Sequence, residues 1–143
     1  MPRRTVYLDT NAFIRFMESE DAHVINLFEQ ARPGIVELYT SELTLAEGLV
    51  SPLRDDDQKL VDAYDDFISG DETLTVVAIS RDILRQSAGL RAELGGKTPE
   101  PIHVAAALAS GCDVFVSSDQ RLRLPDGLVR IPTEPAGSMD TWP

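Results

Sequence analysis

The stretch EPIHVAAALASGCDVFVSSD, residues 100–119, decides the fold class. Residues 102–110 are apolar on nearly every side, which predicts a buried helix that ends at Gly111. Residues 114–116, Val-Phe-Val, then predict a short strand without a polar face. Because such a strand must be covered on both sides, it is typical of a parallel sheet packed between two layers of helices.

Strands and helices alternate along the rest of the chain. Further strands are predicted at residues 5–8, 35–39, 73–79 and, more weakly, 128–131. Further helices are predicted at residues 12–18, 21–32, 40–50, 55–69 and 80–94, with Ser51-Pro52 ending the third of these. This order predicts one α/β domain over residues 1–131, with a central, mostly parallel sheet of four to five strands flanked by helices on both faces. Residues 132–143 carry three prolines and no apolar periodicity, so we expect an irregular C-terminal tail.

The charge balance is the most informative global property. The chain has 143 residues, with 13 Lys and Arg against 24 Asp and Glu, so its formal net charge is −11. Such a protein repels nucleic acid at long range unless bound divalent cations or local arginine patches offset the repulsion. The single cysteine, Cys112, excludes an internal disulfide, and no apolar run approaches the roughly 20 residues that cross a bilayer. We therefore expect a cytoplasmic protein without a membrane partner.

Polar residues follow the predicted strands at their carboxyl ends, where parallel sheets bind ligands. Asp9 and Asn11 follow the first strand, Ser41 follows the second, and Ser117, Ser118 and Asp119 follow the strand at 114–116. Glu47 lies two turns into the helix after the second strand, and Glu100 lies at the start of the buried helix. These elements could bring four carboxylates together at one edge of the sheet: Asp9, Glu47, Glu100 and Asp119. Clustered carboxylates repel one another unless a cation lies among them, and oxygen ligands suit Mg²⁺ or Mn²⁺ rather than zinc. The pattern alone leaves two interpretations open, a metal site and acids that are scattered on the surface.

Four sequence segments in order resemble a PIN-domain nuclease. They are VYLDTNAFI at 6–14, SELTLAE at 41–47, PEPIHVAAA at 99–107 and FVSSDQRL at 115–122. In its length and in the residues of these four segments, the chain is most similar to the VapC-like toxins of bacterial toxin–antitoxin modules. The resemblance implies a small parallel sheet flanked by helices and cleavage of RNA phosphodiester bonds that depends on Mg²⁺ or Mn²⁺.

The resemblance also implies the site residues and the partners. Asp9, Glu47, Glu100 and Asp119 match the family's four acids, and Asn11 and Ser117 match polar positions in the same site. We expect the metal ligands to be Asp9, Glu100 and Asp119. The implied partners are an RNA substrate and a cognate antitoxin protein, and a homodimer is expected.

One position departs from the family pattern. The third acid is usually an aspartate followed by a small residue, whereas this chain has Glu100-Pro101. Glutamate keeps the charge with one more methylene, and proline is tolerated in a first helical turn. The tight octahedral preference of Mg²⁺ makes reduced activity or a preference for Mn²⁺ a possible consequence. His103 is interpreted as a structural residue of the buried helix and Cys112 as a small buried apolar residue.

Two alternatives remain open at this stage. A phosphoacceptor domain, receiver-like or a small phosphatase, also places an aspartate after its first strand. A receiver would require an acidic pair there and a lysine after a late strand, and neither Lys59 nor Lys97 lies in such a place. A non-catalytic PIN-like module that binds RNA or protein is favoured only by Glu100-Pro101, and a metal titration with a nuclease assay separates it from an enzyme.

Overall fold

The computed structural model describes residues 4–18, 36–69, 74–97, 100–119 and 121–131. Five strands form one sheet in the order β3-β2-β1-β4-β5, and all the pairings in it are parallel. The strands are β1 (Arg4–Leu8), β2 (Val36–Ser41), β3 (Leu74–Val77), β4 (Val114–Val116) and β5 (Val129–Ile131). The predicted α/β class is therefore confirmed, and the weak strand expected near the end of the domain is present.

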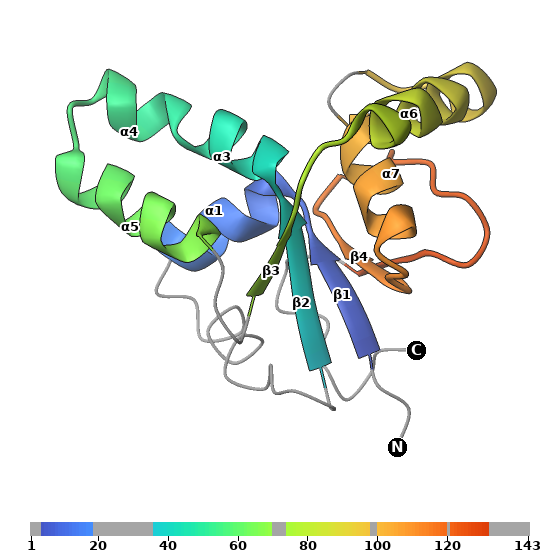
Figure 1. The fold of residues 1–143 in the computed structure, drawn as a ribbon, viewed down its shortest axis with the longest axis horizontal. Coiled ribbons are helices and arrows are strands. Elements are labelled where there is room, and N and C mark those ends of the chain that lie inside the picture. Colours follow the sequence, from blue (N-terminus) through green and yellow to red (C-terminus); the bar gives the residue numbers. More distant parts are fainter. Residues whose placement is uncertain (1–3, 19–35, 70–73, 98–99, 120, 132–143) are drawn as a thin grey trace.

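Two groups of helices lie on the two sides of the sheet (Figure 1). The first group is α1 (Thr10–Glu18), α3 (Glu42–Gly48), α4 (Val50–Arg54) and α5 (Gln58–Ile68). The second group is α6 (Arg81–Leu94) and α7 (Glu100–Ala109). Successive side chains of β1 point to opposite faces, so Val6 and Leu8 join the core under α1 and α5, whereas Tyr7 joins the core under α7.

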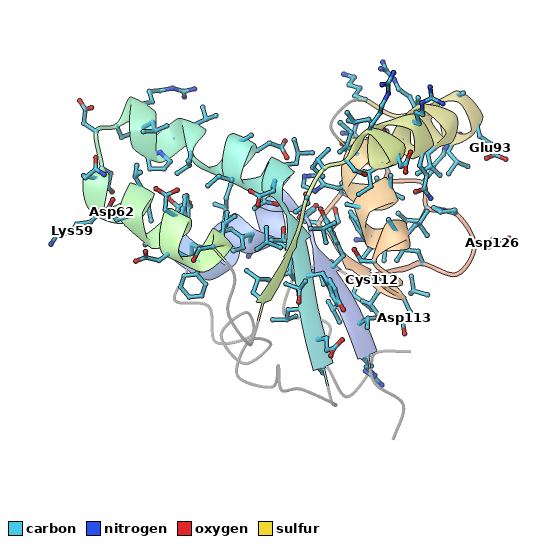
Figure 2. The ribbon with its side chains drawn as sticks, in the orientation of Figure 1. Lys59, Asp62, Glu93, Cys112, Asp113 and Asp126 are labelled. Carbon is cyan, nitrogen blue, oxygen red and sulfur yellow. The ribbon has the colours of Figure 1, made fainter. Side chains whose placement is uncertain are left out.

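The core under α7 is built from small residues on the helix and large residues on the sheet. Residues 105–107 of α7 are three alanines with no exposed surface, which lets the helix lie close against the sheet. Beneath them the ring of Tyr7 stacks on Phe115, with centroids 5.3 Å apart and planes 11° from parallel. Cys112, labelled in Figure 2, is buried in the same core, as its sequence context predicts.

Two helix boundaries differ from the prediction. Ser51-Pro52 does not end a helix, because α3 already stops at Gly48 and Pro52 lies in the first turn of the short α4. Proline is tolerated there, since the first N–H groups of a helix have no partner inside it. Helix α5 begins later than expected, because Asp57 caps it and accepts a hydrogen bond from the Leu60 amide at 3.2 Å.

Two predicted segments cannot be compared with the structure. The helix expected at 21–32 and the tail expected at 132–143 lie outside the described residues, so the division into a domain and a tail stays a prediction. Within the described part of the chain, every helix is too short or too polar to cross a bilayer.

The N-cap of α6 gives a direct test of the local structure. Ser80 Oγ accepts a hydrogen bond from the Ile83 amide at 3.2 Å, which satisfies an N–H group that the helix itself leaves unpaired. We expect Ser80→Ala to lower the free energy of unfolding by about 1 kcal/mol in urea titrations. Ser51→Ala, at an exposed position of α4, is the control. An equal loss in both variants would contradict the capping role.

The chain order places a crevice at the carboxyl end of β1. From β1 the chain adds β2 and β3 on one side, and it later returns to add β4 and β5 on the other. Val6 of the central strand therefore pairs with Leu38 of β2 and with Val114 of β4. Ligands of open parallel sheets bind where the strand order reverses in this way, at the carboxyl ends of the two diverging strands.

Candidate active site

A cavity of about 310 Å³ lies at this crevice. It is formed by the loop after β1, the helices α3 and α7, and the loop after β4. All six residues selected from the sequence line it: Asp9, Asn11, Glu47, Glu100, Ser117 and Asp119. Their roles are not tested by this placement, but their expected proximity is observed.

Asp9 occupies the point where β1 ends and α1 begins. Its amide donates to the Val116 carbonyl of β4 at 3.3 Å, and its Oδ1 accepts from the Ala12 amide at 2.8 Å, as a helix cap does. Burial raises the pKa of the Asp9 carboxyl, although hydrogen bonds from Ala12 and Ser117 oppose that shift. The negative charge of Glu47 adds to the increase. The folded protein therefore holds Asp9 in surroundings that disfavour its charge.

Glu100 and Asp119 form a pair of carboxyl groups across the cavity. Burial raises the pKa of Glu100, and its hydrogen bond with Asp119 and the charge of Asp119 raise it further. Arg121 and Lys97 are close enough to oppose this increase. Asp119 is held by its own loop, since its amide donates to Ser117 Oγ at 3.1 Å and its Oδ1 accepts from the Arg121 amide at 3.0 Å.

Glu47 is the fourth carboxylate and has two hydrogen-bond donors. Thr10 Oγ1 donates to Glu47 Oε1 at 2.6 Å, and His103 Nε2 lies 2.7 Å from the same oxygen. Burial by itself would raise the pKa of Glu47, but these two hydrogen bonds and the nearby imidazole outweigh it and lower the pKa. Glu47 therefore loses its proton at a lower pH than an ordinary glutamate does, whereas the pKa values of Asp9 and Glu100 are shifted in the opposite direction.

His103 and Tyr7 extend this arrangement into the interior, which the sequence interpretation missed. His103 Nδ1 lies 2.6 Å from the Tyr7 hydroxyl, which is also hydrogen-bonded to Ser41 Oγ at 2.9 Å. All three side chains are at most 4% exposed. The imidazole therefore lines the cavity and connects Glu47 to the core under α7. One signal was available, because His103 follows Glu100 by three positions and so shares its helix face.

The remaining polar residues support the loop after β4. Ser117 is 1% exposed, and its amide donates to the Ile131 carbonyl of β5 at 3.0 Å. Arg130 Nη1 donates to the Ser117 carbonyl at 2.8 Å, so β5 holds this loop from behind. Asn11 is an exposed residue in the otherwise buried first turn of α1, and it also lines the cavity.

The donor chemistry of the cavity fits a hard divalent cation. Its ionisable lining is dominated by carboxylates, and burial, followed by the neighbouring carboxylates Glu47 and Asp119, raises the pKa values of Asp9 and Glu100. A bound cation would offset both effects, because it stabilises the charged form of a buried carboxylate. Among the described residues, however, no three histidine, cysteine, aspartate or glutamate side chains lie close enough together to enclose one ion. Glu100 contacts Asp119, whereas Asp9 contacts Ser117 and Glu47 contacts His103. The acids thus share a cavity without forming a single coordination sphere.

Comparison with known proteins gives one family and a set of similar folds. The family model described as the PIN domain matches residues 6–128. No curated protein matches the sequence significantly. A chain of the VapBC2 complex of Rickettsia felis, solved with a DNA fragment of its promoter, has a TM-score of 0.73 at 15% identity, over 90% of this chain and 98% of that one.

Two further solved structures share the fold. A chain of DNA-bound VapBC from Salmonella typhimurium has a TM-score of 0.70 at 21% identity, over 91% of this chain and 98% of that one. VapC20 of Mycobacterium tuberculosis, a toxin that cleaves the sarcin–ricin loop, has a TM-score of 0.63 at 16% identity, over 77% of this chain and 86% of that one. At these identities the likeness concerns the fold.

Proposed function

Because the chain belongs to the PIN domain family, we propose that it is an endoribonuclease that hydrolyses RNA phosphodiester bonds with Mg²⁺ or Mn²⁺. One observation carries the proposal. Four carboxylates that are far apart in the sequence, Asp9, Glu47, Glu100 and Asp119, line a single cavity at the switch point of the sheet. Carboxylate oxygens hold the hard divalent cations that assist phosphodiester hydrolysis.

The residues divide into two groups by their surroundings. Asp9, Glu100 and Asp119 are proposed to hold the cation, which when bound polarises a phosphoryl oxygen and makes water a stronger nucleophile. Glu47 is proposed to orient the attacking water, because hydrogen bonds from His103 and Thr10 hold its carboxylate in place and lower its pKa. Carboxyl groups whose pKa values are shifted in opposite directions within one cavity are candidates for a functional site.

Single-stranded RNA is the proposed substrate. Sequence-specific proteins read RNA mainly in loops and ends, where unstacked bases are accessible, so a structured RNA with an exposed loop is favoured. The net charge of −11 opposes long-range attraction to any polyanion. The structural similarity to a toxin that cleaves the sarcin–ricin loop supports a loop substrate.

A toxin role with a protein inhibitor is proposed as well. The similar chains come from toxin–antitoxin complexes, which supports a cognate antitoxin. The acidic cavity would attract a basic side chain, and an arginine can pair with carboxylates through its planar guanidinium and block the scissile phosphate. A homodimer and a cytoplasmic location remain expectations of the same proposal.

A metal-dependent cleavage assay tests the proposed function. We expect cleavage of single-stranded RNA with Mg²⁺ or Mn²⁺ and none with EDTA. Glu100→Asp should retain activity, whereas Glu100→Gln should lose at least about 90% of it, because an amide cannot supply the negative charge. Glu93→Gln is the matched control, since Glu93 is exposed on α6 and does not line the cavity (Figure 2). Full activity of Glu100→Gln would remove Glu100 from the ligand set.

A non-catalytic RNA-binding module is the second candidate. It is favoured by the absence, within the described residues, of three acids close enough to share an ion. That candidate predicts RNA binding that is unchanged by Mn²⁺ and by EDTA, with no cleavage in either condition. Cation-dependent cleavage by purified protein would exclude it.

A further inference from the structure

A second cavity of about 360 Å³ lies beside the acidic one. It is formed by the end of α6, the start of α7 and the loop after β4. Glu100 and Leu122 line both cavities, so the two adjoin each other. Ligand pockets commonly measure about 300–1,000 Å³, which makes this one large enough for a nucleotide-sized group.

The floor of the second cavity is apolar. Leu90 and Leu94 contribute from α6, Pro101 and Val104 from α7, and Leu122 from the loop after β4. Val104 is only 2% exposed, so the floor is continuous with the core under α7. A surface of this kind favours a flat group with apolar faces and disfavours a phosphate.

The rim of the second cavity is positively charged, in contrast to the chain as a whole. Arg121 and Arg123 line it, and both are exposed. Lys97 lies near the same edge, since its charge and that of Arg121 act on Glu100. Guanidinium groups attract phosphates and also stack on the faces of nucleic-acid bases. A cationic rim around an apolar floor is therefore complementary to a nucleotide.

Two glycines line the second cavity where α6 ends. Gly95 and Gly96 have φ values of +80° and +100°, which residues with a side chain rarely adopt. A Cβ added to Gly96 would lie 3.8 Å from Pro101 Cγ and 3.9 Å from Glu100 Oε2. Both distances are ordinary van der Waals contacts, so a side chain at Gly96 would be disfavoured by the backbone conformation and not by lack of space.

We propose that the second cavity is a base pocket, which receives one unpaired base of the RNA next to the phosphate that is cleaved. The inference rests on the proposed function, because it takes the acidic cavity as the place of the scissile phosphate. The base would lie on Leu90, Leu94 and Val104, with a guanidinium of the rim against its edge or face. The flanking phosphates would then lie beside Arg121 and Arg123.

Deleting the base and filling the pocket should have the same effect. In the RNA, the base flanking the cleaved bond is replaced by an abasic ribose. In the protein, Leu94→Trp fills the pocket, and Leu84→Trp is the control, since Leu84 is an exposed residue of the same helix outside the pocket. We expect each of the first two changes to reduce kcat/KM about tenfold, and their combination to reduce it no further. Leu84→Trp should have no effect.

If Leu94→Trp and the abasic RNA together reduced kcat/KM by the product of their separate effects, the two changes would act at separate places. That result would overturn the base pocket. Unchanged cleavage by Leu94→Trp would also overturn it. A shift of Leu94→Trp in oligomeric state, seen by analytical ultracentrifugation, would assign the cavity to contact between copies of the chain instead.

A binding measurement separates the failure of this inference from the failure of the proposed function. Short single-stranded RNA with 2-aminopurine at the flanking position reports on base unstacking by fluorescence. We expect a fluorescence change on binding to the wild-type chain and to Leu84→Trp, and a loss of that change with Leu94→Trp. If no RNA is cleaved under any condition, the nuclease proposal fails. The fluorescence change still shows whether the second cavity binds a base. Binding without a change in the wild type would overturn it.

Discussion

Replacement of Asp9 by asparagine is expected to abolish cleavage and to leave the fold intact. The asparagine side chain would retain an oxygen that accepts from the Ala12 amide, so the cap of α1 survives. The charge proposed to hold the cation is lost, and we expect kcat to fall at least about a thousandfold, equal to ~4 kcal/mol of transition-state stabilisation. Cleavage is measured on the RNA used for the wild type.

The stability of the same variant should depend on pH in a defined direction. Burial raises the pKa of Asp9, so folding is opposed by the charged carboxylate above the ordinary aspartate range, and this penalty disappears in acid as the group is protonated. Without divalent cations, Asp9→Asn should therefore melt at or above the wild-type temperature at neutral pH, and the difference should vanish in acid. Added Mn²⁺ should raise the melting temperature of the wild type alone.

A matched substitution shows whether the effects of Asp9→Asn come from losing a charge in the cavity or from losing any negative charge of the protein. Asp126→Asn removes one negative charge from an exposed turn (Figure 2) and should change neither cleavage nor the response to Mn²⁺. Full activity of Asp9→Asn would remove Asp9 from the proposed site. A melting temperature well below that of the wild type at neutral pH would show that its carboxylate has a structural role.

Removal of His103 is expected to have the second largest effect. His103→Leu leaves Tyr7 and Glu47 without their shared partner, and we expect a loss of about 2–4 kcal/mol in the free energy of unfolding. Because Glu47 also loses one of the two donors that lower its pKa and fix its orientation, kcat should fall about 10- to 100-fold with KM unchanged. His103→Gln keeps an N–H donor toward Glu47 and should recover part of kcat.

Two further variants show whether His103 acts only through stability. Val114→Ala truncates a side chain that is 2% exposed in the other core, so it should destabilise the protein without changing kcat of the folded fraction. Tyr7→Phe keeps the ring against Phe115 but removes the hydroxyl at His103 Nδ1, and it should lower kcat less than His103→Leu does. Equal kcat losses in His103→Leu and Val114→Ala would contradict a positioning role.

The fold was predictable because local patterns and global packing agree. The wholly apolar strand at 114–116 and the alanine-rich helix before it can be buried only in a covered parallel sheet, and that is where the structure has them. Boundaries were less predictable, because capping decides them. Asp55, Asp56 and Asp57 are equivalent by composition, but Asp57 caps α5, and Asp56 adopts a φ of 52° in the preceding turn.

The positions of the cavity residues that follow strands could be predicted from the sequence. The positions of residues that connect to the cavity through the buried core could not. Asp9 and Asp119 follow β1 and β4 closely, so topology alone brings them to one edge. Tyr7 and His103 occupy ordinary core positions in the sequence, and only the packing of α7 on β1 brings the hydroxyl of one to the imidazole of the other. The position of Arg121 and Arg123 at the second cavity could not be predicted from the sequence either. They line a common cavity with the end of α6 only in the folded chain.

The placement of β1 at the centre of the sheet has a consequence for biosynthesis. Its first residues emerge from the ribosome early, but one of its two neighbours is β4, and Thr5 bonds to Asp113 across 108 positions. Such long-range pairing forms only after the intervening chain is available. During translation, the edge of β1 next to Asp9 therefore stays unpaired until β4, in the last third of the chain, has been synthesised. A nascent chain can therefore complete the acidic cavity only after Glu100, β4 and Asp119 have been synthesised.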